Sequence, residues 1–174
     1  RGTLFFDVAR IIKKRKPKII FLENVANFAS HDNGKTLGTV KKVLIDLKYN
    51  FFYKILNSSN FGVPQSRKRT YMIGIKKSYN DNEFIFPKSI NKDIRLLDFL
   101  EKKIDPKSTV FKNKKAVLRK NITKNANLFN LLPNKPIRIG TVNKGGQGER
   151  IYSPLGHSIA LTAYGGGIGS KTGL

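Results

Sequence analysis

The chain has 174 residues, which is enough for one sizeable hydrophobic core and part of a second. Its 34 Lys and Arg against 11 Asp and Glu give a formal net charge of +23, which favours a nucleic-acid partner, although a coding bias towards Lys and Asn would raise the charge without one. The absence of Cys excludes disulfides, Cys-based zinc sites and a thiolate nucleophile within these residues, and no apolar run is long enough for a membrane span or a secretory signal, so we expect a cytoplasmic protein.

Both ends of the sequence look cut. It begins with Arg1 rather than Met, and it stops at Leu174 directly after a Gly-rich run. We therefore expect a fragment of a longer protein.

The first predicted elements are a helix and a strand. The helix is indicated by apolar residues at three- and four-residue spacing, namely Leu4, Phe5, Val8, Ile11 and Ile12. It ends before Pro17, and residues 18–25 follow as a strand in which the uninterrupted apolar run 19–22 ends in a carboxylate. Such a run is typical of a central parallel strand covered on both faces.

Glu23 lies near the end of this predicted strand. Ligands of parallel sheets gather outside the carboxyl ends of the strands, which would place Glu23 at the rim of an active site. A salt bridge between Glu23 and one of the many lysines nearby is the alternative interpretation.

The next segments continue the alternation. Residues 31–34 predict a turn, the apolar stripe within 37–47 predicts a helix, and 51–56 and 70–75 predict strands joined by the loop 57–67. Strands alternating with helices indicate an α/β fold, a partial doubly wound, Rossmann-like sheet that is parallel or mixed and has helices on both faces.

The composition changes near Leu100, after a short amphipathic helix predicted at 94–100. Beyond it the chain is basic, then rich in Gly and Pro, with β-type segments at 137–142 and 159–163. We place a domain boundary here, with 1–100 as one domain and 101–174 as part of a small second domain of strands and loops.

Arg67 and Arg69 lead into the strand 70–75. In an extended chain, residues two apart share a face, so their guanidinium groups would form a fork for phosphate oxygens or a base carbonyl. Alternatively, the two arginines are simply solvent-exposed basic residues before a strand, which would give the same sequence pattern.

Two Gly-rich clusters follow, at 145–150 and 164–172. In the second, Gly165 and Lys171 have the spacing of a phosphate-binding P-loop, but Ser170 stands where that motif has Gly. The alternative is bare backbone that approaches a ligand closely, beside Gln147 and Arg150, which are residue types that read bases. Plain surface loops remain a third interpretation.

Taken in order, residues 1–6, 23–25 and 64–69 and the Gly-rich tail resemble the cytosine-5 DNA methyltransferases, in particular those of bacterial restriction-modification systems. The resemblance implies a methyltransferase fold, with 1–100 as the later part of the catalytic domain and 101–174 as the first part of the target-recognition domain. It further implies that the complete protein is a monomer, is associated with the nucleoid and is encoded beside a restriction endonuclease.

The resemblance also implies a reaction, the transfer of a methyl group from S-adenosyl-L-methionine to carbon 5 of a cytosine flipped out of double-stranded DNA. In such enzymes a Cys thiolate attacks carbon 6, and Glu23 would hold or share a proton at nitrogen 3. Arg69 would contact the cytosine O2, Arg67 would support the pocket or a phosphate, and Leu4 would pack against the cofactor. The loop that carries the Cys is absent from this chain, so we expect the chain alone to be inactive.

In the tail, the resemblance implies target recognition by a set of seven residues. Gln147 would fill the space left by the flipped base, and Arg150 would read guanine. The full set is Gln147, Glu149, Arg150, Tyr164, Gly165, Gly166 and Gly167. The target would resemble GCGC, although Ala160 and His157 depart from the related pattern.

Two other hypotheses stay open from the sequence. One is a noncatalytic, basic DNA-binding remnant of such an enzyme. The other is a nucleotide-hydrolysing protein that uses the P-loop-like residues 165–172.

Overall fold

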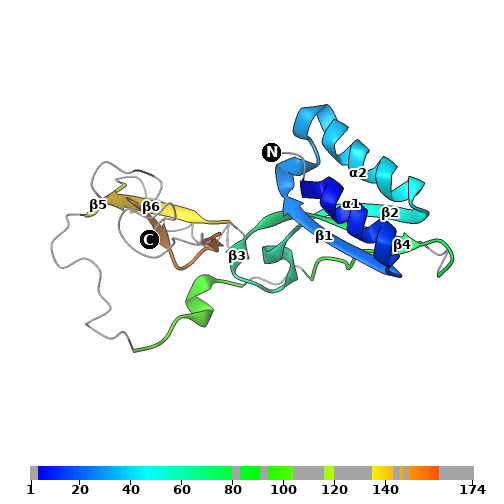
Figure 1. Ribbon diagram of the computed structural model, residues 1–174. Helices are drawn as coiled ribbons and strands as arrows, with labels where there is room; N and C mark the ends of the chain where they lie inside the picture. The colour runs from blue at the N-terminus through cyan, green and yellow to red at the C-terminus, as the bar shows by residue number, and fades with distance from the viewer. Residues whose placement is uncertain are drawn as a thin grey trace. The chain divides into compact units, whose positions relative to one another are not determined.

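The computed structural model describes residues 4–79, 83–90, 94–103, 116–119, 135–142, 146 and 149–160. The chain divides into two compact units, Arg1–Leu56 with Lys68–Lys88, and Asn57–Arg67 with Ser89–Leu174 (Figure 1). This division differs from a single boundary at Leu100, because 57–67 and 89–100 group with the second unit. The assignment of a catalytic and a recognition domain stays a prediction.

The first unit contains the elements expected from the apolar spacing. In chain order they are α1 (Leu4–Arg15), β1 (Ile19–Val25), the 3-10 turns η1 (Ala26–Phe28) and η2 (His31–Gly34), α2 (Lys35–Asp46), β2 (Tyr49–Asn57) and β4 (Lys68–Lys76). The α/β class is therefore confirmed.

The strands of this unit form a sheet in the order β1-β4-β2. β1 runs antiparallel to β4 along its whole length, from Ile19 opposite Ile75 to Val25 opposite Arg69. The described pairing of β1 with β4 is therefore antiparallel rather than parallel, and it joins strands that are more than forty residues apart in the sequence.

The expectation that residues 18–25 form a central parallel strand covered on both faces is wrong for the part of the chain that the structure describes. β1 lies at the edge of the described sheet, and Ile19, Phe21 and Val25 are exposed. An apolar run shows that neither face is strongly polar, but it does not show which strand pairs with it or whether a helix covers each face.

The core lies between the sheet and the two helices, which lie on the same face (Figure 1). Its buried members are Ile12, Ile20, Leu37, Val40, Leu44, Tyr49 and Met72. In α1 the apolar stripe is narrower than expected, because Phe5, Val8 and Ile12 pack inwards while Leu4 and Ile11 are exposed. Gly74 lies opposite Ile20, and an added Cβ there would come within 3.2 Å of the Ile20 side chain.

The second unit contains two small sheets. β3 (Gln65–Ser66) pairs in parallel with β8 (Ser158–Ile159), and β5 (Ala116–Leu118), β6 (Ile137–Val142) and β7 (Arg150–Ser153) form an antiparallel sheet in the order β5-β6-β7. β6 coincides with the predicted segment 137–142, whereas β7 was not anticipated.

The short helix predicted at 94–100 is a single 3-10 turn, η4 (Leu96–Phe99), and a second one, η3 (Ser58–Phe61), lies in the loop 57–67. η4 is closed at its start by Asp98, whose carboxylate accepts the Arg95 N–H at 2.9 Å. Among the described residues, no helix has the length and apolar composition needed to cross a bilayer.

Tyr49 links the start of β2 to the chain before β1. Its ring is almost fully buried, its hydroxyl donates a 2.6 Å hydrogen bond to the Pro17 carbonyl, and burial raises the pKa of Tyr49 above its usual 10.0. We expect Tyr49→Phe to lower the free energy of unfolding by about 1–2 kcal/mol, because the hydrogen bond is lost and the Pro17 carbonyl no longer has the Tyr49 hydroxyl as its donor.

The pH dependence gives a second readout. A phenol whose pKa is higher in the folded state stabilises the fold fully below pH 10, and this contribution is lost as the pH rises further, because the unfolded chain ionises first. Urea unfolding should therefore show that the advantage of wild type over Tyr49→Phe shrinks above pH 10. The exposed Tyr53→Phe serves as the control, and an equal effect of both substitutions would contradict the role of burial.

Candidate functional site

The face of the sheet opposite the helices carries Glu23 and Arg69. Antiparallel pairing sets Glu23 opposite Tyr71, so Arg69, two residues before Tyr71, is its diagonal neighbour on the same face. The Arg69 Nε lies 2.8 Å from the Glu23 Oε1. The structure thus brings together two of the residues that the sequence predicted as catalytic, and Arg69 is an ion-pair partner of Glu23.

The surroundings of this pair are partly apolar. The rings of Phe21 and Tyr71 lie 5.7 Å apart on the same face. The Arg69 side chain is 18% exposed and that of Glu23 39%, so the carboxylate is the more accessible partner. Arg69 also donates from Nη1 to the Lys68 carbonyl at 2.8 Å, which fixes the guanidinium in place.

Thr70 holds the chain where it leaves β1, a role that no sequence pattern indicates. Thr70 is fully buried, and its hydroxyl lies 3.2 Å from the carbonyl oxygens of both Val25 and Ala26. The Asn24 side chain accepts the Val25 N–H at 2.9 Å. Together these contacts fix the backbone directly after Glu23.

A cavity of about 880 Å³ opens beside the carboxyl end of β1. Leu4 and Glu23 both line it, so the predicted cofactor residue and the predicted catalytic carboxylate share one cavity. The complete lining is Leu4, Phe5, Phe6, Val8, Leu22, Glu23, Asn24, Phe28, His31, Asp32, Lys35, Thr36, Thr39, Val40 and Met72. Its volume lies in the range of roughly 300–1,000 Å³ that holds small ligands.

The polar wall of the cavity comes from η2 and the first turns of α2, for which the sequence predicts only a turn and a helix. His31 Nδ1 lies 2.7 Å from the Thr36 hydroxyl, and Asp32 is 4.0 Å from the Lys35 ammonium. Asp32, Asn33 and Gly34 all have positive φ values, of 51°, 52° and 83°. Asp and Asn tolerate this conformation best after Gly, which was the available signal for a sharply shaped loop.

An apolar wall with carboxylate, amide and hydroxyl groups suits a ligand such as S-adenosyl-L-methionine, which has an aromatic base, a ribose and an amino-acid end. Leu4, at 75% exposed, is free to pack against such a ligand. The described residues contain no cluster of His, Asp and Glu that could hold a metal ion.

Arg67 belongs to the second unit, and the strand is interrupted there between β3 and β4. Its N–H donates to the Asn57 side chain at 2.8 Å, and its carbonyl accepts the Ser58 N–H at 3.2 Å. The Arg67 backbone therefore closes the base of the loop 57–67. Its side chain is exposed, and the role of that side chain in supporting a pocket or a phosphate stays a prediction.

Of the predicted recognition residues, the structure describes Glu149 and Arg150; Gln147 and Tyr164 to Gly167, like the P-loop-like segment 165–172, lie outside the described residues. Glu149 closes a turn, because its carboxylate accepts the Gly146 N–H at 2.9 Å and its own N–H donates to the Gly146 carbonyl at 3.0 Å. Arg150 begins β7, and within the described part of the chain its buried Nε has no hydrogen-bond partner.

In the sequence His157 is only a departure from the pattern of related proteins. It is fully buried, and neither ring nitrogen has a hydrogen-bond partner among the residues that the structure describes. The backbone N–H of His157 donates to the Lys135 carbonyl at 3.2 Å. The backbone N–H of the next residue, Ser158, donates to the Pro64 carbonyl at 2.8 Å. His157 thus lies inside the second unit rather than on a surface that reads DNA.

The family model for the C-5 cytosine-specific DNA methylases matches residues 1–150. The chain belongs to this family. The Type II methyltransferase M.HhaI of Haemophilus parahaemolyticus is 47% identical over 173 residues, which are 99% of this chain and 51% of that protein. M.SsoII of Shigella sonnei is 46% identical over 112 residues, 63% of this chain and 30% of that protein.

The chain therefore spans about half the length of the first relative and less than a third of the second. Among solved structures, the S. pombe Dnmt2 methyltransferase has a TM-score of 0.47 at 21% identity, with 71% of this chain and 38% of that chain covered. Enzymes of this family are methyltransferases that in general use S-adenosyl-L-methionine, and these relatives belong to restriction-modification systems.

We expect that breaking the Glu23–Arg69 ion pair has only a small effect on the free energy of unfolding. Because the Glu23 carboxylate is 39% exposed, we expect Glu23→Gln to lower the free energy of unfolding by no more than about 1 kcal/mol. A double-mutant cycle with Arg69→Gln, followed by urea unfolding, measures the coupling. A coupling well above this value would mean that the pair chiefly stabilises the fold.

Proposed function

We propose that the complete protein is a DNA (cytosine-5-)-methyltransferase of a restriction-modification system, with double-stranded DNA as substrate and S-adenosyl-L-methionine as methyl donor. The observation that carries this proposal is the Glu23–Arg69 pair, accessible on one sheet face and next to the cavity that Leu4 lines. Membership of the methylase family supports the reaction class.

In the proposed reaction the cytosine leaves the base stack, because its carbon 5 is unreachable inside the duplex. A thiolate adds to carbon 6, and a proton held by Glu23 neutralises the negative charge that develops at nitrogen 3. Carbon 5 then gains the methyl group and loses its proton to a water molecule, and as the thiolate is expelled the proton on nitrogen 3 returns to the Glu23 carboxylate. The bound cofactor supplies the methyl group on a positively charged sulfur.

Arg69 has two tasks in this proposal. Its Nε orients the Glu23 carboxylate at 2.8 Å, and one N–H of Nη1 goes to the Lys68 carbonyl. A guanidinium has five N–H donors, so others remain for the cytosine O2. Arg67 would support the pocket or a phosphate.

The thiolate must come from elsewhere, since the chain contains no Cys. We propose that it is supplied by a part of the protein outside these 174 residues and that the chain alone does not transfer methyl groups. The exposed apolar residues Ile19 and Phe21 on the edge strand β1 support a further part of the protein that covers this face.

A noncatalytic DNA-binding remnant is the second candidate, favoured by the charge of +23 together with the missing Cys. The reading frame upstream of Arg1 distinguishes the two. A Pro-Cys-Gln loop there supports the enzyme, whereas a stop codon or a replaced Cys supports the remnant.

For the complete protein we expect Glu23→Gln to slow methyl transfer by at least about 100-fold, because an amide cannot give a proton to nitrogen 3. DNA affinity should change little. Bisulfite sequencing of plasmid DNA reports the methylation, and fluorescence anisotropy reports binding. Glu101→Gln, on an exposed residue of the second unit, is the matched control; full activity of Glu23→Gln would remove the proton-donor role.

Site recognition is proposed to depend on Arg150 and Gln147, with a GCGC-like target. Arg150→Ala should cost about 1–3 kcal/mol of discrimination at one base position, since a bidentate contact to guanine is lost. Binding competition between target and altered duplexes measures this. The exposed Arg119→Ala is the control, and unchanged base preference in Arg150→Ala would refute the assignment.

A further inference from the structure

A cluster of positive charge lies at the end of the first unit that is remote from Glu23. Three chain segments meet there: the Lys76 N–H donates to the Lys18 carbonyl at 2.9 Å, the Lys77 N–H donates to the Lys48 carbonyl at 3.0 Å, and Tyr49 reaches the Pro17 carbonyl. We call this surface the basic pole. It consists of Lys13, Lys14, Arg15, Lys16, Lys18, Lys48, Lys76 and Lys77.

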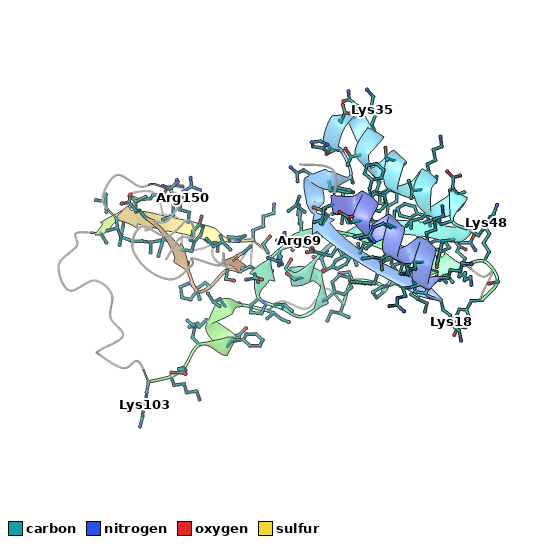
Figure 2. All side chains as sticks on the ribbon, viewed as in Figure 1. Lys18, Lys35, Lys48, Arg69, Lys103 and Arg150 are labelled. Atoms are coloured by element: carbon teal, nitrogen blue, oxygen red, sulfur yellow. The ribbon has the colours of Figure 1, made fainter. Side chains whose placement is uncertain are left out.

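The basic pole is separate from the proposed catalytic face. β1 begins directly after Lys18, and Glu23 lies five residues further along this strand, about 16 Å at the rise of an extended chain. Figure 2 shows Lys18 and Lys48 at the opposite end of the first unit from Arg69. A ligand that binds along the catalytic face therefore does not explain the positive charge of the basic pole.

The charge of the pole is almost uncompensated. Segments 13–18, 46–48 and 76–79 contain its eight cationic residues and one carboxylate, Asp46, so eight minus one leaves seven positive charges. Within the described part of the chain none of the eight is ion-paired, and all except the half-buried Lys76 are exposed. Lys18 lies over the Tyr79 ring, 4.9 Å from its centre.

Helix ends explain only part of this cluster. Cations are favourable in the last turn of a helix, which accounts for the residues at the end of α1. Lys18, Lys76 and Lys77, however, lie at strand ends. Lys16 and Lys48 have positive φ values of 48° and 69°, in positions after the two helices where Gly is ordinarily preferred, so backbone preference does not select Lys there.

We propose that the basic pole is a second binding surface for duplex DNA that contacts the phosphate backbone without reading sequence. Seven of its eight residues are Lys, which acts as a point charge and suits phosphates rather than base edges. DNA is the polyanion on which this family acts. The surface would hold flanking or neighbouring DNA and keep the protein on the polymer between target sites.

The test uses the complete protein without a methyl donor and a duplex of arbitrary sequence, so it does not depend on methyl transfer or on the proposed role of Glu23. The pole variant carries Lys16→Gly, Lys18→Gln, Lys48→Gly and Lys77→Gln; the two Gly substitutions suit the positive φ values. The control variant removes four charges from exposed lysines elsewhere, as Lys54→Gln, Lys88→Gln, Lys102→Gln and Lys103→Gln.

Fluorescence anisotropy between about 0.05 and 0.3 M KCl gives the salt dependence of binding. The slope of log K against log salt should fall by about 3–4 in the pole variant, nearly one for each lost phosphate contact, and by less than about 1 in the control. At about 0.1 M salt the pole variant should bind at least 10-fold more weakly than the control. Equal losses in both variants would mean that only net charge matters and would overturn the proposal.

A measurement on the unaltered chain covers the case in which the pole variant does not fold. Acetylation with and without duplex DNA, read by mass spectrometry, should show Lys18, Lys48 and Lys77 protected more strongly than Lys54 and Lys88. No difference in protection overturns the proposal. Protection of the pole by poly-L-glutamate but not by DNA would assign it to an acidic protein and would overturn it equally.

Discussion

The antiparallel pairing of β1 with β4 is the constraint on which the rest of the site depends. It sets Glu23 opposite Tyr71 and makes Arg69 the diagonal neighbour of Glu23, which yields the 2.8 Å ion pair. A shift of the register by one residue would move Arg69 to the face that the helices cover. Met72 and Gly74 hold that register from the other face, since Met72 belongs to the core and Gly74 accepts the Ile20 side chain closely.

The sequence predicted the elements well because local spacing decides them. The helices α1 and α2 and the strands β2, β4 and β6 all formed where their apolar patterns indicated. Local spacing does not predict which strand pairs with β1 or whether both faces of β1 are buried. Its partner β4 lies more than forty residues away in the sequence. β7 was missed because its four residues follow a Gly-rich stretch that looks like a loop.

The candidate site was predictable in part. Glu23, Arg69 and Leu4 were identified from family resemblance, and the structure explains why the first two meet and why Leu4 and Glu23 share a cavity. Thr70 gave no signal, because a Thr in a strand is ordinary until its hydroxyl is seen against the carbonyls of Val25 and Ala26. Such a role exists only after the two strands have paired.

Alternation along β1 also explains how one strand serves two environments. Leu22 packs against the helices, whereas Glu23, the next residue, lies on the opposite face beside Arg69. The cavity reaches both residues because the strand ends two residues later and Thr70 fixes the chain as it turns away. A ligand that enters from the helix side can therefore approach the carboxylate around the end of the strand, while the carboxylate stays open to a second reactant on the other face. Such an arrangement would suit the proposed methyl transfer, because two substrates held at one strand end can meet with their reacting atoms close together.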